Sequence, residues 1–243
     1  MSLRLPPVPA LALIGLLPAL PLGAQADLVY VTETGLAYHR AGCPSLQRTR
    51  LPVALAEAVE LGYASCGVCL PPPPAAGPAV APRGLYRVNL AGATRSEPGE
   101  LEAMPRALVV RHVDGDTVYV AMPRPPEGLG TRERLRLLGV DCPEVGRTNP
   151  DARQMALAAS EFTRRRLQGR VVRLAFDWRL RDRYGRLLAY VYLPDGSCHN
   201  AELLREGFAH AYTRFPFQFL EEFRALQSAA RRQGRGLWAA SGQ

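Results

Sequence analysis

The chain of 243 residues contains no lysine, so all 30 of its basic residues are arginine. An arginine is therefore expected by chance in most windows of the sequence, and no single arginine identifies a site. Only 22 residues are acidic, which leaves a formal net charge of +8 and a pI near 9.7. This balance favours a polyanionic partner, nucleic acid or an acidic surface, over a neutral metabolite. The 47% of apolar residues suffice for the cores of one or two globular domains.

Long apolar runs are also scarce, and the one that occurs lies at the N-terminus. Residues 1–26 combine Arg4, an apolar run interrupted by proline, and the small-residue triplet Ala24-Gln25-Ala26. This pattern is typical of a cleavable secretory signal peptide, with an uncleaved membrane anchor as the alternative. We therefore expect a secreted or periplasmic mature chain that starts at Asp27 and has no membrane contact. No sequence pattern fixes the oligomeric state, for which we expect a monomer.

The chain has five cysteines, and three of them lie with His39 in a short module, residues 27–70. A Cys66-x2-Cys69 turn supplies two thiolates, and His39-x3-Cys43 completes a Cys3His tetrahedron for a structural Zn²⁺. Because so short a module buries little apolar surface, the metal would contribute folding free energy. In an oxidising compartment the alternative is a disulfide or redox pair between Cys66 and Cys69.

Local patterns within the module predict strands over 28–32 and 36–38 and a helix over 53–61. The strings YHRAGCPSL and YASCGVC resemble the small zinc-binding modules similar to the metal-binding domain of Ada-type repair proteins. This resemblance covers residues 39–69 and implies a closed, structural metal site.

The pattern changes twice after the module. Residues 71–105 begin with four consecutive prolines and stay rich in Ala, Gly and Pro, which predicts a linker. Residues 106–240 alternate strand and helix patterns. The predicted strands cover 107–112, 117–121, 135–140, 171–176 and 187–193, and the predicted helices run from Asn149 to Gly169, over 200–206 and from Phe217 to Gly234. Five short strands with a helix between the third and fourth predict an α+β or all-β fold, a five-stranded OB-fold barrel with packed helices.

Acidic side chains follow two of these strands. Asp114-Gly115-Asp116 alone is a common hairpin turn, but Asp141 ends the third predicted strand and would meet Asp116 at a neighbouring strand end. Two such carboxylates are costly unless a cation or an arginine lies between them. Carboxylate, carbonyl and water oxygens suit Ca²⁺, with Mg²⁺ as the competitor.

Two arginines and a further acid complete a possible catalytic set. Arg136 and Arg186 could converge on a cation-bound phosphate and stabilise the charge of a transition state. Glu144, three residues past Asp141, could deprotonate or orient a water in a metal-assisted hydrolysis without a covalent intermediate.

Three strings, VDGDTV, RLLGVDCPE and DRYGR, occur in this order and at separations that resemble the staphylococcal nuclease family. The resemblance covers about residues 106–238 and implies the five-stranded OB barrel of that family. It also implies a Ca²⁺-dependent endonuclease, a hydrolase that cuts the phosphodiester bonds of DNA and RNA. In that family's pattern Asp116 and Asp141 are the calcium carboxylates, and Cys142, where threonine is usual, offers its backbone carbonyl.

The same resemblance assigns the remaining site residues. Glu144 is implied as the general base, and Arg136 and Arg186 as catalytic groups that bind the phosphate. Tyr184 matches the tyrosine near the nucleotide. Asp114 matches an acidic position beside the calcium ligands, and Asn200 a structural asparagine at a helix start.

Two other interpretations remain open at this point. A nuclease-like barrel can lose catalysis and keep the fold, which would leave a module that only binds nucleic acid or protein. Alternatively, the protein is chiefly a metal or redox module with a basic stabilising domain. For Cys142 and Cys198, a disulfide and buried free thiols are both possible.

Overall fold

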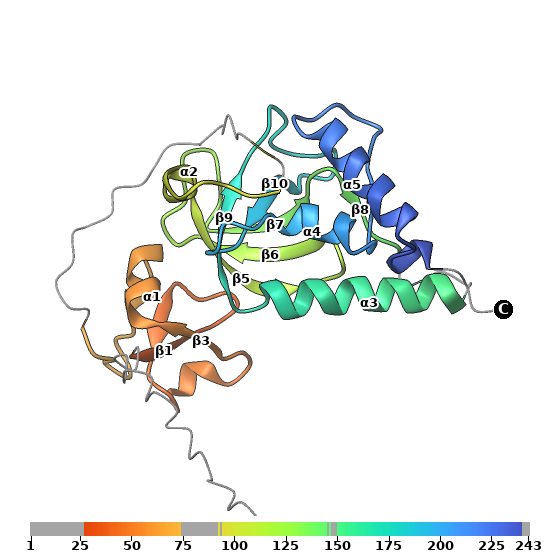
Figure 1. The fold of residues 1–243 in the computed structure, drawn as a ribbon. Coiled ribbons are helices and arrows are strands. Elements are labelled where there is room, and N and C mark those ends of the chain that lie inside the picture. The colour runs from red at the N-terminus through yellow and green to blue at the C-terminus, as the bar shows by residue number, and fades with distance from the viewer. Residues whose placement is uncertain (1–26, 74–91, 93, 145, 147–149, 240–243) are drawn as a thin grey trace, which may run out of the picture.

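The computed structural model describes residues 27–73, 92, 94–144, 146 and 150–239 (Figure 1). The predicted signal peptide and residues 74–91 of the predicted linker lie outside these residues, so the predicted domain boundaries remain a prediction. Among the described residues, none of the helices has the length and apolar character that a membrane span requires.

The N-terminal module is a four-stranded sheet with one helix. Its strands are β1 (Leu28–Val31), β2 (Ala37–His39), β3 (Leu51–Ala54) and β4 (Ala64–Ser65), in the order β3-β1-β2-β4. The single turn η1 (Pro44–Leu46) precedes β3, and helix α1 (Leu55–Leu61) follows it. The predicted helix over 53–61 started two residues too early, because Val53 and Ala54 pair with Val29 and Leu28 in the sheet.

The second domain is a closed five-stranded barrel, as predicted. Its strands follow the order β10-β7-β6-β5-β9. Their bounds are β5 (Arg106–His112), β6 (Thr117–Ala121), β7 (Arg132–Leu137), β9 (Val171–Ala175) and β10 (Leu187–Tyr192). Antiparallel pairing joins all neighbours except β10 and β7, which run parallel and close the barrel.

The third predicted strand, 135–140, is in fact two strands. β7 ends at Leu137, and Gly139 turns the chain with a φ of 76°, a value that favours glycine. A Cβ at Gly139 would also lie 2.7 Å from the Phe217 ring. The separate strand β8 (Val140–Asp141) then pairs with β11 (His210–Ala211) outside the barrel.

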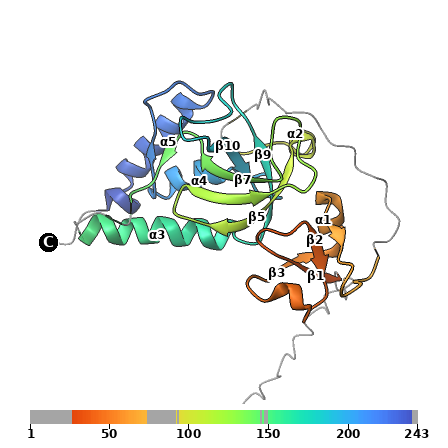
Figure 2. The ribbon, with the colours of Figure 1, turned by 180° about the vertical axis from the view of Figure 1, so that it is seen from behind.

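Helices cover the barrel on several sides (Figures 1 and 2). They are α2 (Pro98–Ala103), α3 (Pro150–Leu167), α4 (His199–Arg205), α5 (Leu220–Arg232) and the turn η2 (Gly236–Trp238). Asn200, predicted as a structural asparagine, is the second residue of α4 and is fully buried. Its amide accepts a hydrogen bond from Val191 N and donates to the carbonyls of Leu138 and Ala189, so it ties α4 to β10 and to the turn before β8.

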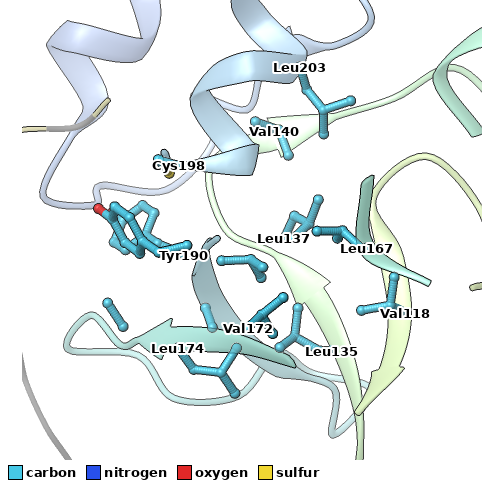
Figure 3. Close-up of a cluster of buried hydrophobic side chains, with 14 of the residues drawn as sticks. Val118, Leu135, Leu137, Val140, Leu167, Val172, Leu174, Tyr190, Cys198 and Leu203 are labelled. Carbon is cyan, nitrogen blue, oxygen red and sulfur yellow. The ribbon is translucent and has the colours of Figure 1, made fainter. Parts of the chain in front are cut away.

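The barrel interior is filled by apolar side chains from every strand (Figure 3). Leu135 and Leu137 alternate with outward-facing polar residues along β7 and are 0% and 1% exposed. This alternation is what the sequence pattern predicted, because successive side chains of a strand point to opposite faces. Arg136, between the two leucines, therefore faces outward.

The N-terminal module shares a second apolar core with the outside of the barrel. Val29, Tyr38 and Leu61 of the module pack in one buried cluster with Leu108 and Val171 of the barrel. The two ribbon views both place the module beside β5, on the side away from α5 (Figures 1 and 2). The sequence had indicated a separate unit, whereas the burial joins the module to the barrel.

Ion pairs reinforce this contact at its edge. The carboxylate of Glu33, in the module, lies 3.0 Å from Arg111 Nε and 2.8 Å from Arg132 Nη2. Arg132 also donates to the Glu33 carbonyl at 2.8 Å. Both guanidinium groups lie over the Tyr119 ring, at 4.2 and 5.1 Å from its centroid. One acid of the module is thus held by two arginines of the barrel.

Candidate functional site

A cleft of about 700 Å³ opens where four segments of the barrel domain meet. These segments are the β5–β6 turn, the end of β7 with β8, the loop before β10 and the loop after β11. The cleft is lined by every residue that the sequence assigned to the barrel site, namely Asp114, Asp116, Arg136, Asp141, Cys142, Glu144, Tyr184 and Arg186. Residues separated by up to 72 positions therefore face one space.

Arg136 joins the two acids predicted to hold calcium. Its Nη1 lies 2.9 Å from Asp116 Oδ2, and its Nη2 lies 2.8 Å from Asp141 Oδ1. Nη1 also donates to the Val140 carbonyl at 2.8 Å, which fixes the direction of the guanidinium. One planar guanidinium therefore reaches both carboxylates and supplies the positive charge that the sequence required beside them.

Burial sets the electrostatics of this pair. The side chain of Asp116 is 10% exposed, whereas that of Asp141 is 53% exposed. Burial raises the pKa of Asp116 to about 7, and the Arg136 charge opposes that rise. Cys142 N and the Thr117 hydroxyl donate to the Asp116 carboxylate at 2.8 and 3.1 Å. The carboxylate is therefore positioned by donors on three sides.

Glu144 and Arg186 reach the cleft from different segments. Glu144 is exposed and lines the cleft. Arg186 Nε lies 2.7 Å from Asp182 Oδ2, and the Asp182 carboxylate also accepts from the backbone N–H groups of Tyr184 and Arg186. These bonds close the loop before β10 and hold the pKa of Asp182 below its usual range, against the effect of burial.

Cys142, where the resemblance to the nuclease family implies a threonine, is a buried thiol packed on glycine. A Cβ on Gly115 would lie 2.8 Å from both Cβ and Sγ of Cys142 and 3.1 Å from the Ala159 side chain. Burial and, next, the Asp116 charge raise the pKa of Cys142 well above its usual range, so the thiol stays protonated at neutral pH. Cys142 and Cys198 are both free buried thiols, as one of the two interpretations held.

A chain of polar contacts that no sequence motif indicates supports the β5–β6 turn. Thr163 of α3 donates its hydroxyl proton to the Gly115 carbonyl at 2.6 Å. The Thr163 hydroxyl oxygen also lies 3.0 Å from Nε2 of His199, which is fully buried at the start of α4. Two helices therefore hold the carbonyl that separates Asp114 from Asp116. No spacing rule signals this chain, since its members are 36 and 48 residues apart.

Comparison with known proteins identifies the family. A family model described as Staphylococcal nuclease homologue matches residues 134–240. The Thermonuclease of Staphylococcus hyicus is 36% identical over 132 residues, which cover 54% of this chain and 74% of that relative. This chain belongs to the staphylococcal nuclease family.

Other relatives support the same family. The Thermonuclease of Staphylococcus intermedius is 42% identical over 104 residues, covering 43% of this chain and 58% of its own. An Escherichia coli protein named Uncharacterized endonuclease is 35% identical over 135 residues, which cover 54% of this chain and 75% of that relative. The nuclease-family model starts after the N-terminal module, so the family assignment does not extend to the four candidate zinc ligands.

Those four candidate ligands do converge. One ligand atom each from His39, Cys43, Cys66 and Cys69 lies within 4.8 Å of all the others. Tetrahedral Zn²⁺ with bonds of about 2.3 Å to sulfur places its ligands roughly 3.8 Å apart, so the cluster fits that ion after a small contraction. Burial raises the pKa of Cys69, and the hydrogen bond that its Sγ accepts from Arg40 N at 3.4 Å opposes that rise.

Proposed function

We propose that this protein is an exported, Ca²⁺-dependent endonuclease that hydrolyses phosphodiester bonds of DNA and RNA. The observation that carries the proposal is the bridge from Arg136 to Asp116 and Asp141. It lies in the cleft that Glu144 and Arg186 also line. Nuclease and endonuclease names among the relatives support the same activity.

The donor set fits Ca²⁺. Asp116, Asp141, the backbone carbonyl of Cys142 and water would supply the oxygen ligands that Ca²⁺ prefers, without the strict octahedron that Mg²⁺ demands. When bound, the ion would neutralise phosphate charge and favour ionisation of a coordinated water. The buried Asp116 would anchor the ion, and the exposed Asp141 would leave room for the substrate.

In this proposal the protein's own groups divide the hydrolysis between them. Glu144 accepts a proton from the water whose oxygen forms the new bond to phosphorus, while the bond from phosphorus to the leaving oxygen breaks. The guanidinium groups of Arg136 and Arg186 hold the non-bridging oxygens and stabilise the added negative charge. Tyr184 offers a ring face beside Arg186, whose Cζ lies 5.6 Å from the ring centroid.

For the N-terminal module we propose a structural Zn²⁺ held by the Cys3His cluster, as in the Ada-like modules. Its ligand atoms already converge, and the module alone is small. The shared core with the barrel extends the effect of the metal to the catalytic domain.

The test is degradation of circular DNA and of RNA by the mature chain, with calcium supplied or chelated. We expect cleavage only with calcium, and linear products that show internal cutting. Glu144→Gln should lower turnover by roughly a hundredfold or more and retain substrate binding. Glu127→Gln is the matched control, because this exposed acid lies in the β6–β7 loop outside the cleft lining. Full activity in chelator, or in Glu144→Gln, would reject the mechanism.

Export has its own test. Protein recovered from the medium or periplasm of an expressing bacterium should begin at Asp27 when its N-terminus is sequenced. A product that keeps residues 1–26 and sediments with membranes would show an anchor instead.

A further inference from the structure

Glu133 is a buried acid outside the cleft. Among the described residues two carboxylate side chains are buried, those of Asp116 and Glu133, which are 7% and 8% exposed. Asp116 belongs to the proposed calcium site, whereas Glu133 does not line the cleft and has no part in the proposed hydrolysis. Burying a carboxylate costs free energy, and exchanging a buried ion pair for apolar residues is often neutral or stabilising. Stability alone therefore explains Glu133 poorly.

The partner of Glu133 is Arg181, in the loop before β10. Arg181 Nη1 lies 2.8 Å from Glu133 Oε2, and its Nη2 lies 2.6 Å from Oε1, so the pair is bidentate. Gly130 N donates to the same carboxylate at 2.7 Å. Burial would raise the pKa of Glu133, but the hydrogen bonds from Arg181 and Gly130 N outweigh it and hold that pKa below its usual range. A bidentate pair between charged groups fixes the direction of both side chains.

Arg181 extends this constraint to the backbone of Arg186. Its Nη1 also donates to the Gly185 carbonyl at 3.1 Å, and that carbonyl belongs to the peptide group that joins Gly185 to Arg186. From the inner side of the same turn, the Asp182 carboxylate accepts from the backbone N and from Nε of Arg186. The turn is therefore held from two sides, by Asp182 within it and by Glu133 of β7 through Arg181.

Strand β7 carries the other arginine of the proposed site. Arg136 lies three residues after Glu133 on this strand, and it pairs in the sheet with Leu188, two residues after Arg186. Strand pairing thus sets the start of β10 beside β7, and the ion pair sets the turn that precedes it. We infer that the Glu133–Arg181 pair positions Arg186 relative to Arg136. The kinetic consequence rests on the proposed function, in which both arginines hold one phosphate.

Kinetics with and without Arg186 test this role. Glu133→Gln and Arg181→Gln should each lower kcat by roughly tenfold or more, because a misplacement of about 1 Å can cost a hundredfold. KM should change less than kcat, since the added negative charge that Arg186 stabilises exists only in the transition state. In an Arg186→Gln chain, which lacks the guanidinium to be positioned, neither change should lower kcat further. Arg181, with a side chain that is 35% exposed, is the safer of the two positions for folding.

The matched control is another bidentate pair. Glu161 accepts from Arg164 Nε and Nη2, both at 2.7 Å, on α3 and outside the cleft lining. Glu161→Gln removes the same charge from a pair of the same geometry and should leave kcat unchanged. A loss equal to that of Glu133→Gln would show a general effect of charge and overturn the inference.

Hydrogen exchange gives a readout that does not depend on catalysis. The amides of Gly185 and Arg186 donate to Asp182, so they should exchange slowly in the wild-type chain. Glu133→Gln should speed exchange in peptides that cover residues 181–187 and leave the β5–β6 turn unchanged.

Three results would overturn the inference. They are an unchanged kcat in Glu133→Gln and Arg181→Gln, an equal fold loss with and without Arg186, and unchanged exchange over residues 181–187. If the wild-type chain shows no cleavage, the proposed hydrolysis fails by itself. Faster exchange confined to residues 181–187 in the variants would then still support the positioning of Arg186, and unchanged exchange would reject it.

Discussion

We expect the buried His199 to make the stability of this protein sensitive to mild acid. Thr163 has one hydroxyl proton, which it donates to the Gly115 carbonyl, so it must accept from Nε2–H of His199. Nδ1 then carries a lone pair without a hydrogen-bond partner in the described structure. Protonation would place a charge on this buried nitrogen, near the cationic Arg166. Burial, and next Arg166, lower the pKa of His199 to about 3.

The magnitude follows from the difference between the folded and unfolded chains. Because the pKa of His199 is lower in the folded chain than in the unfolded chain, the free energy of unfolding is not reduced above the unfolded pKa of 6.5. It decreases as the pH falls from 6.5 toward the folded pKa. In this pH range the unfolded chain binds a proton at this histidine and the folded chain does not. The free energy of unfolding then falls by about 1.4 kcal/mol per pH unit. From pH 6.5 to 4 this loss amounts to about 3 kcal/mol.

Comparison with His199→Gln isolates this loss from that of the carboxylates. The glutamine variant will be less stable at neutral pH, because it loses the stacking of His199 on Phe162, with ring centroids 5.5 Å apart. Its denaturant midpoint should, however, fall less steeply between pH 6.5 and 4, so that the two unfolding free energies converge. His210→Gln, at an exposed histidine, is the matched control. Parallel profiles for wild type and His199→Gln would refute the reasoning.

Three further outcomes are expected. Thr163→Val should lower turnover by roughly tenfold, because the Gly115 carbonyl loses its donor, while Thr163→Ser should retain activity in the same cleavage assay. Arg136→Gln should lower turnover by roughly a hundredfold and also lower the calcium concentration for half-maximal rate, since two carboxylates lose their cationic partner; an unchanged calcium titration would contradict the pairing. Cys66→Ser, or a strong chelator, should lower the melting temperature of the barrel along with that of the module, because the two share a core; an unchanged barrel transition would show that the contact is energetically irrelevant.

The strands and the three site motifs could be predicted because each is a short pattern of residues close together in the sequence. Strand and turn patterns located all five barrel strands, although the third was predicted over 135–140 and β7 in fact runs from Arg132 to Leu137. The two-residue strands β8 and β11 escaped, since so short a pairing has no period. Helix α2 escaped as well, inside a stretch whose composition indicated a linker.

Features formed by packing between distant segments could not be predicted. His199 and Thr163 meet Gly115 only after α3 and α4 have docked on the barrel. The N-terminal module docks on the barrel through apolar residues. From the sequence alone, the same residues could equally form a small core within the module. Glu33 pairs with Arg111 and with Arg132, the second of which is 99 residues away in the sequence. No sequence motif indicates either pair.

Arg136 links the two halves of the proposed chemistry. In the structure its guanidinium is committed to Asp116, Asp141 and the Val140 carbonyl, which leaves few of its donors for a phosphate. A cation held between the two carboxylates would replace the positive charge of Arg136 beside them. The Arg136 guanidinium would then be free to turn toward the cleft. A phosphate would favour the same rearrangement from the other side, by drawing the guanidinium away from the acids. In the proposed mechanism calcium and substrate would therefore each favour the state that the other needs, and such mutual dependence would be positive coupling between their two sites.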